Sequence, residues 1–229
     1  MRLSSFMILA ASVGLASSVW AMAPPHLRSI AQSFVAKLTT VQAPAAPRSP
    51  HVVSAWSAEL IAQAQAQIGV TLTYDGSYQA LSYPDGDIPR ARGVCTDVVI
   101  RALRDAHGID LQKRVHEDMK RAFSSYPNNW NLSRPDKNID HRRVPNLRAY
   151  FKRQGAALEV STDPAAYLPG DIVTWTLGPG LPHIGIVSDQ MTPDAARPLI
   201  LHNVGAGTRK EDFLFRYPIT GHYRVEQKI

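Results

Sequence analysis

The sequence predicts an α+β fold, in which helices come first along the chain and an antiparallel sheet follows. Apolar residues recur at helical spacing as far as Gln154, whereas short apolar runs separated by Pro, Gly and Asp follow from Ala157 onward. The 229 residues, 45% of them hydrophobic, suffice for one domain with a sizeable core. Charged residues at 19%, with 14 Gly and 17 Pro, exclude a disordered, collagenous or coiled-coil chain.

The first 21 residues have the pattern of a secretory signal peptide. Arg2 precedes an uncharged apolar run from Phe6 to Val19, and Val19-Trp20-Ala21 favours cleavage after Ala21. An uncleaved anchor is the alternative, although the run is shorter than the about 20 residues that a spanning helix needs. We therefore expect a periplasmic or secreted protein without stable membrane insertion after cleavage.

The remaining chain is predicted to contain a linker and one domain. Residues 22–53 form a tail that ends in a Pro/Ala-rich linker, and residues 54–229 form the folded domain. Removing residues 1–21 deletes Arg2 and lowers the formal charge from +6 to +5. Outside the cytoplasm, such a charge favours anionic cell-wall polymers or peptides with carboxylates over nucleic acid. A basic surface without a specific partner is the alternative.

The apolar spacing predicts four helices and five strands. The helices are expected at residues 54–68, 95–106, 111–123 and 146–154, with a long polar loop at 126–143. The strands are expected at residues 157–160, 171–175, 183–187, 199–203 and 221–225.

The single Cys, Cys95, falls in the first turn of the second predicted helix. A helix start lowers the pKa of a thiol, and an exported free thiol without a use is disfavoured, so Cys95 is a candidate nucleophile. Gly93 allows a close approach before the helix, and the N–H of Cys95 is free to face an oxyanion. Asp97 opposes thiolate formation, and its spacing predicts an ion pair with Arg101. The alternative is that Cys95 is a small buried apolar residue.

A Cys nucleophile needs a base, and the base needs an orienting group. Three of the eight His, His183, His202 and His222, lie at strand edges. If His183 faces His202 across an antiparallel pair, the two side chains share a face and one ring can orient the other. Asn203 then points to the opposite face, which makes it a weaker orienting group. Asp171 is an alternative orienting group, although a turn role suits it better.

That register has consequences for the rest of the strand pair. Val187 faces Pro198, and the turn-forming residues Ser188–Arg197 make the connecting loop.

Several motifs resemble those of the NlpC-type cell-wall cysteine peptidases of the papain-like superfamily. The resemblance lies in Gly93-Val94-Cys95-Thr96-Asp97, Pro169-Gly170-Asp171-Ile172-Val173, His183-Ile184-Gly185-Ile186-Val187 and Leu201-His202-Asn203. The chain is most similar to an exported bacterial family called domain of unknown function 1287, in two further runs. These are Asn138-Ile139-Asp140-His141-Arg142-Arg143-Val144-Pro145-Asn146-Leu147 and Tyr217-Pro218-Ile219-Thr220-Gly221-His222-Tyr223.

The resemblance implies a papain-like fold with Cys95 as nucleophile, His183 as base and His202 as orienting group. It also places Tyr74 near the oxyanion site. Val94-Cys95-Thr96-Asp97 replaces the usual Asp-Cys-Ser-Gly of NlpC-type enzymes, and residues 111–143 have no counterpart that can be placed.

The expected function is cleavage of an amide bond in peptidoglycan stem peptides or cross-links, by a monomer that needs no cofactor. Tyr74, Asp97, Arg142 and Asn203 are candidate substrate-binding residues, and Arg142 with Arg143 would pair with stem-peptide carboxylates; a solvated loop is the alternative for both arginines. Two other functions stay open. One is a non-catalytic module that binds cell-wall polymer, and the other is a zinc site made from Cys95, His183 and His202, with or without His222.

Overall fold

The computed structural model describes residues 52–226 and 228–229. The described residues form a compact unit. The predicted signal peptide and most of the predicted linker lie outside the described residues. Among the described residues, no helix has the length and apolar character needed to cross a membrane.

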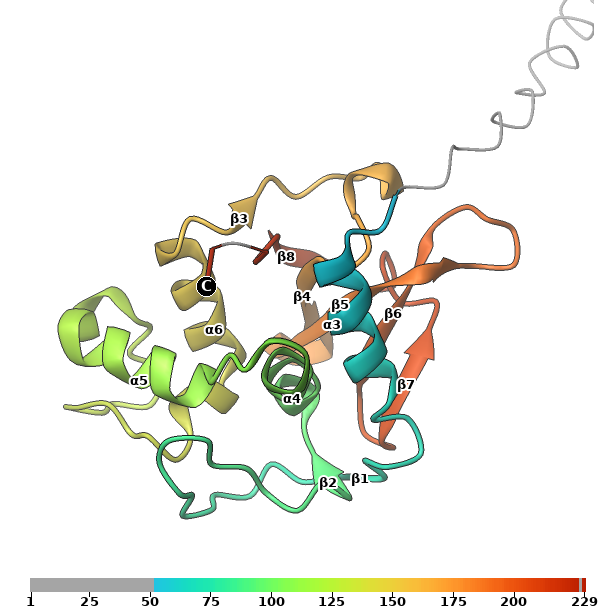
Figure 1. Cartoon of the computed structure of the whole chain (residues 1–229). Coiled ribbons are helices and arrows are strands. Elements are labelled where there is room, and N and C mark those ends of the chain that lie inside the picture. Colours follow the sequence, from blue (N-terminus) through green and yellow to red (C-terminus); the bar gives the residue numbers. More distant parts are fainter. Residues whose placement is uncertain (1–51, 227) are drawn as a thin grey trace, which may run out of the picture. The chain divides into compact units, whose positions relative to one another are not determined.

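The described unit combines helices with an antiparallel sheet, as predicted (Figure 1). The α-helices are α3 (Ala55–Gln65), α4 (Cys95–His107), α5 (Leu111–Ala122) and α6 (Val144–Arg153). The short 3-10 helices are η1 (Phe123–Ser125), η2 (Asp140–Arg142), η3 (Pro164–Ala166) and η4 (Gly178–Gly180). The strands are β1 (Thr73–Tyr74), β2 (Arg92–Gly93), β3 (Ala157–Leu158), β4 (Ile172–Leu177), β5 (Leu181–Met191), β6 (Pro198–Asn203), β7 (Thr208–Glu211) and β8 (Ile219–Tyr223).

The main sheet has six strands in the order β3-β8-β4-β5-β6-β7, and all its neighbours are antiparallel. The strands β1 and β2 form a separate parallel pair just before α4. Figure 1 shows α4 nearly end-on, with β4 and β5 above it in the view, β6 above and to the right, and β1 and β2 below. The start of α4 therefore lies where the small pair and the main sheet approach each other.

Local sequence sets the ends of the helices. Ser54 caps α3 by accepting a hydrogen bond from the N–H of Ser57. The Asp97 carboxylate accepts a 2.7 Å hydrogen bond from the N–H of Val94 and so caps the start of α4. Gly108 ends α4 at φ 64°, a left-handed conformation in which glycine carries no steric cost.

Two apolar clusters cover the two faces of the main sheet. The helix-side cluster joins residues of α3, α4, α5 and α6 to Ile184 and Ile186 of β5 and Leu201 of β6. The outer cluster packs Trp175 of β4 and neighbouring strand residues against Phe213 and other side chains from connecting segments. Residues Cys95 to Leu103 of α4 are all buried, so α4 is the central helix of the unit.

The predicted register of β5 and β6 is wrong by two residues. Ile186 pairs with Leu201 and Val187 with Ile200, so Gly185 is the residue opposite His202. An irregularity after Val187 extends β5 to Met191, which pairs with Pro198 and shortens the connecting loop. A shift of two residues keeps every side chain on its predicted face, because side chains alternate with a period of two.

Several parts of the fold were not predicted, among them the β1–β2 pair, β7 and η2. The strand β7 has the sequence Thr-Arg-Lys-Glu, which has no apolar alternation because the strand lies at an edge of the sheet. Residues 140–142, predicted as part of a polar loop, form η2 and are buried.

Candidate active site

Cys95 is the first residue of α4, as predicted, and its side chain is 4% exposed. Gly93 makes the predicted close approach, since a Cβ atom there would lie 3.1 Å from the Nη1 of Arg101 and 3.3 Å from the Cβ of Asp97. The first N–H groups of a helix have no intrahelical acceptor. The backbone at Cys95 therefore supplies donors beside the thiol.

The Cys95 thiol is protonated in the resting structure. Burial raises its pKa to about 11, although hydrogen bonds from the backbone of Ile184 and from the Tyr74 side chain oppose this shift. The charge of Asp97 raises the pKa further, as its position in the sequence predicts. The helix start alone does not produce a thiolate here, because the cost of burying a negative charge exceeds the stabilisation by nearby donors.

His183 and His202 are in direct contact, as predicted. The Nε2 of His183 lies 2.8 Å from the Nδ1 of His202, and both rings are buried. They pack against Trp175 and Phe213, which belong to the outer cluster. Gly185 leaves the space opposite His202 free of a side chain, so the two imidazoles meet diagonally rather than head-on.

The Cys95 thiol contacts β5 at the residue that follows His183. Within residues 52–226 and 228–229, no hydrogen bond joins Cys95 to a ring nitrogen of His183. The thiol instead contacts the backbone of Ile184, the next residue, whose side chain lies on the helix-side face. The His183 ring packs against Trp175 on the outer face of the sheet, whereas Cys95 belongs to the helix-side cluster.

Asp97 and Arg142 form a buried ion pair, which corrects two sequence interpretations. Asp97 does not pair with Arg101, whose guanidinium binds Asp87 instead. Arg142 does not lie in a solvated loop, because its Nε and Nη2 donate to the Asp97 carboxylate at 3.0 and 2.9 Å.

Arg142 has little hydrogen-bonding capacity left for a substrate. Besides Asp97, its guanidinium donates to the backbone carbonyls of Asp75 and Ser77. These contacts use four of about five available N–H groups. Its own carbonyl accepts a hydrogen bond from the Oγ1 of Thr96. Arg142 therefore joins the segment 75–77 and η2 to the start of the cysteine helix.

Asn203 is fully buried on the helix-side face of β6, opposite to His202 as predicted. Its Nδ2 donates to the carbonyl of Gly93 at 3.0 Å. This hydrogen bond joins the end of β6 to the residue two before Cys95. Asn203 thus supports the backbone of the site and does not orient His183.

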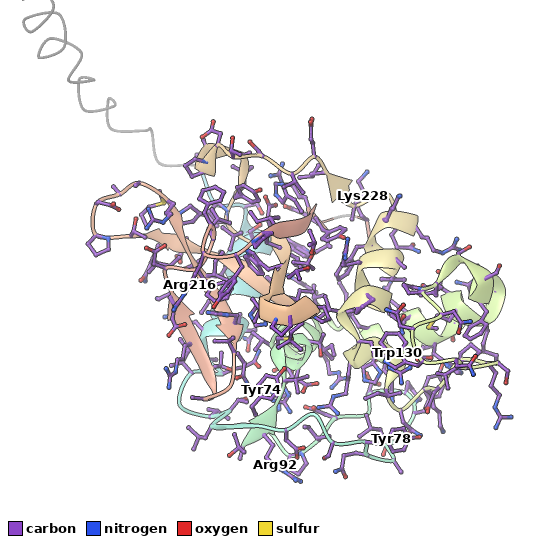
Figure 2. All side chains as sticks on the ribbon, turned by 180° about the vertical axis from the view of Figure 1, so that it is seen from behind. Tyr74, Tyr78, Arg92, Trp130, Arg216 and Lys228 are labelled. Carbon is purple, nitrogen blue, oxygen red and sulfur yellow. The ribbon has the colours of Figure 1, made fainter. Side chains whose placement is uncertain are left out.

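Cys95 opens into a cleft of about 490 Å³. Its lining combines aromatic, apolar and cationic side chains: Tyr74, Gly76, Tyr78, Val94, Cys95, Trp130, Ile139, Arg142, Arg143, Val144, Pro145, Leu181 and Pro182. Figure 2 shows Tyr74 beside α4, with Tyr78 and Trp130 further along the same side. The cleft also reaches Leu181 and Pro182, the two residues before His183.

The aromatic side chains of the cleft are exposed but held in place. The hydroxyl of Tyr78 donates to Asp136 and accepts from Asn138, while Arg143 lies 4.0 Å from the ring centre of Trp130. Burial raises the pKa of Tyr74, so its hydroxyl stays protonated beside Cys95. Tyr74 is thus placed as a hydrogen-bond donor, as the predicted oxyanion role requires.

Of the residues of the alternative zinc site, His183 and His202 are in contact, but Cys95 and His222 do not join them in one cluster. His222 binds the Oδ2 of Asp171 at 2.7 Å, and Asp171 also accepts from Arg224 and from the N–H of Leu168. Asp171 therefore has a turn role, as favoured, and does not contact His183. In the described part of the chain, no three His, Cys, Asp or Glu side chains form a group that could hold a metal.

Glu211 is a site residue that the sequence did not indicate. Its Oε2 lies 3.3 Å from the Nε2 of His202, on the side away from His183. Nothing in the sequence points to it, because it lies on the polar edge strand β7, which has no recognisable strand pattern.

The fold and site define an α+β protein with a helix-start cysteine, a histidine pair on the adjoining sheet and a cleft at the thiol. The model of the family described as Domain of unknown function (DUF1287) matches residues 61–225, and the chain belongs to this family. It is also similar to YijF, an uncharacterized protein of Escherichia coli strain K12. The two are 51% identical over 186 residues, which cover 81% of this chain and 90% of YijF. No solved structure matches the chain.

Proposed function

We propose that the protein is an exported cysteine hydrolase with a papain-like arrangement of Cys95, His183 and His202. The observation that carries this proposal is the 2.8 Å contact between His183 and His202, next to the residue whose backbone meets the Cys95 thiol. Nucleophilic catalysis needs a nucleophile, a base that takes its proton and a group that orients the base.

The reaction is hydrolysis of an amide bond. The Nδ1 of His183 takes the proton of Cys95, and the thiolate attacks the substrate carbonyl carbon. The Cys95 N–H and the Tyr74 hydroxyl stabilise the oxyanion. Protonated His183 then gives its proton to the leaving amine, and water hydrolyses the thioester with His183 again as the base.

We propose peptidoglycan stem peptides or cross-links as the substrate class. The support is the NlpC-type resemblance of the motifs that form the site, together with the cleft beside the thiol. The cleft, at about 490 Å³, has room for a short peptide segment. Arg143 offers it a positive charge, and the rings of Tyr74, Tyr78 and Trp130 offer flat surfaces. The net positive charge of the chain favours approach to anionic cell-wall polymer.

Digestion of purified sacculi tests the reaction. Protein purified after expression of the full chain should release muropeptides, and both iodoacetamide and Cys95→Ala should reduce the release at least about 100-fold, because covalent catalysis is lost. Cys95→Ser is a matched variant of nearly equal volume. Release that survives both the loss of the thiol and alkylation would contradict the proposal.

A non-catalytic cell-wall-binding module is the second candidate, because the resting thiol is buried and its pKa is raised to about 11. It predicts that wild type and Cys95→Ala co-sediment equally with sacculi and that neither releases muropeptides. Thiol-dependent turnover by the wild type would exclude it.

A further inference from the structure

Glu211 is the only carboxylate among the described residues that lies against the histidine pair. Its Oε2 is 3.3 Å from the Nε2 of His202, whose other nitrogen, Nδ1, contacts the Nε2 of His183 at 2.8 Å. His202 is fully buried, and within residues 52–226 and 228–229 its Nε2 makes no hydrogen bond of regular geometry, so its polar contact is the ion-pair distance to Glu211. The contacts therefore form a chain from Glu211 through His202 to His183.

The chain is built on paired strands. Glu211 faces Ile200 across the β6–β7 ladder, and Arg209 faces His202. These four side chains lie on the outer face of the sheet, because successive side chains along a strand point to opposite faces. The backbone of the sheet thus sets the face on which Glu211 lies, and its carboxylate, 32% exposed, also lies 3.8 Å from the Nη1 of Arg209.

Chemistry assigns the protons along this chain. An ionised carboxylate only accepts hydrogen bonds, so the Nε2 of His202 must carry the proton that faces Glu211. In a neutral imidazole the other nitrogen is then an acceptor, so the Nδ1 of His202 accepts from the Nε2–H of His183. The Nδ1 of His183 is left without a proton.

Both rings are neutral near pH 7, as this assignment needs. Burial and the neighbouring His202 lower the pKa of His183 to about 3. Burial lowers the pKa of His202 to about 4, although Glu211 opposes this shift. The charges of Arg216 and Arg209 also lower the pKa of His202. Figure 2 labels Arg216 beside the strands of the main sheet.

We propose that Glu211 is a positioning residue that selects the tautomers of His202 and His183, so that the Nδ1 of His183 is free to accept the proton of Cys95. This inference rests on the proposed cysteine-hydrolase function. Without the carboxylate, His202 is free to adopt the opposite tautomer, in which its Nδ1–H donates to His183. His183 then carries its proton on Nδ1 and cannot act as the base.

The tautomers are measurable without any substrate. Long-range ¹H–¹⁵N correlation spectra of the ¹⁵N-labelled protein distinguish protonated from unprotonated ring nitrogens, and His183→Gln and His202→Gln assign the two rings. At pH 7 the wild type should show protonated Nε2 and unprotonated Nδ1 in both rings. Glu211→Gln should show a mixture of tautomers, because an amide both donates and accepts.

The matched controls are Glu211→Asp and Asp212→Asn. The first keeps a group that only accepts and should keep the wild-type tautomers. The second removes one negative charge from the next residue, which pairs with Arg197 and not with the histidines. Unchanged ring protonation in Glu211→Gln, or an equal change in Asp212→Asn, would overturn the proposal.

Catalysis gives the second measurement. Glu211→Gln should lower kcat roughly tenfold or more and change KM little, because general-base catalysis typically contributes about 10²- to 10⁴-fold. If the wild type releases no muropeptides, the hydrolase proposal fails, while the spectra still decide whether Glu211 selects the tautomers.

Discussion

At the residue scale, the contact between the His183 and His202 rings depends on a residue without a side chain opposite His202. Gly185 occupies that position, and a Cβ atom there would lie 2.8 Å from the Cγ2 of Ile200 and 3.1 Å from the Cβ of His202. Phe213 of the outer cluster packs against both imidazole rings. Gly185 is therefore required by space rather than by backbone conformation.

Gly185→Ala should destabilise the protein by about 1–3 kcal/mol, because an extra methyl group in a packed core forces neighbouring atoms to move. Chemical denaturation measures the loss. Gly178→Ala is the matched control, since a Cβ atom at Gly178 would meet nothing within 4 Å, and its change should stay within about 0.5 kcal/mol. Equal effects of the two substitutions would contradict this explanation.

At the scale of elements, the start of α4 is held from two directions. Arg142 of η2 binds Asp97 in the first turn of α4, and Asn203 at the end of β6 binds the carbonyl of Gly93. The two contacts come from segments about 45 and 110 residues away in the sequence. The position of the thiol thus depends on the docking of η2 and β6 as much as on the helix itself.

Asp97→Asn should lower the free energy of unfolding by about 3–5 kcal/mol, because it leaves the buried Arg142 guanidinium without a counter-charge. Asp105→Asn is the control. The Arg90–Asp105 pair has side chains that are 47% and 24% exposed, and such pairs contribute at most about 1 kcal/mol. Urea denaturation of both variants distinguishes the two contributions, and similar losses would show that Asp97 is not stabilised by Arg142 in this way.

The elements also show where sequence reasoning succeeds. The helix containing Cys95 and the opposite faces of His202 and Asn203 follow from local periodicity, because each depends on residues close together in the chain. The ion pair of Asp97 with Arg142 does not follow, since its members are 45 residues apart. The spacing of four residues between Asp97 and Arg101 predicted that these two would pair, but the buried Arg101 guanidinium pairs with Asp87 instead.

The same distinction applies to the sheet. Turn residues predicted the β5–β6 connection, but the predicted strand register differs from the observed one by two residues. The alternation of apolar and polar residues gives no sign of the irregularity beyond Val187. The strand β7 was missed because an edge strand needs no apolar face. Glu211 could not be predicted for that reason, although it completes the contacts of the histidine pair.

At the scale of the whole molecule, buried neutral histidines make stability depend on pH. Burial lowers the pKa of His141 and of His183 to about 3. Unfolding exposes these rings, whose pKa then returns to its usual value near 6.5. Protons therefore bind the unfolded chain more strongly between about pH 6 and pH 3, and stability falls as the pH falls through this range.

His141→Gln should remove its share of this dependence while leaving the proposed catalytic residues unchanged. The slope of the unfolding free energy against pH, measured by denaturation between pH 5 and pH 6, should decrease by about 1.4 kcal/mol per pH unit relative to the wild type. Identical slopes in the two proteins would mean that His141 is already protonated in the folded state or that it stays neutral in both.

The burial of Cys95 has one more consequence, which concerns oxidation. Disulfide exchange and peroxide oxidation both proceed through the thiolate, so a thiol that is 4% exposed and protonated at rest reacts slowly by either route. The arrangement that makes the resting sulfur a weak nucleophile thereby preserves it in reduced form. Among the thiols of proteins, a sulfur held in this way is one of the slowest to be modified by an oxidant.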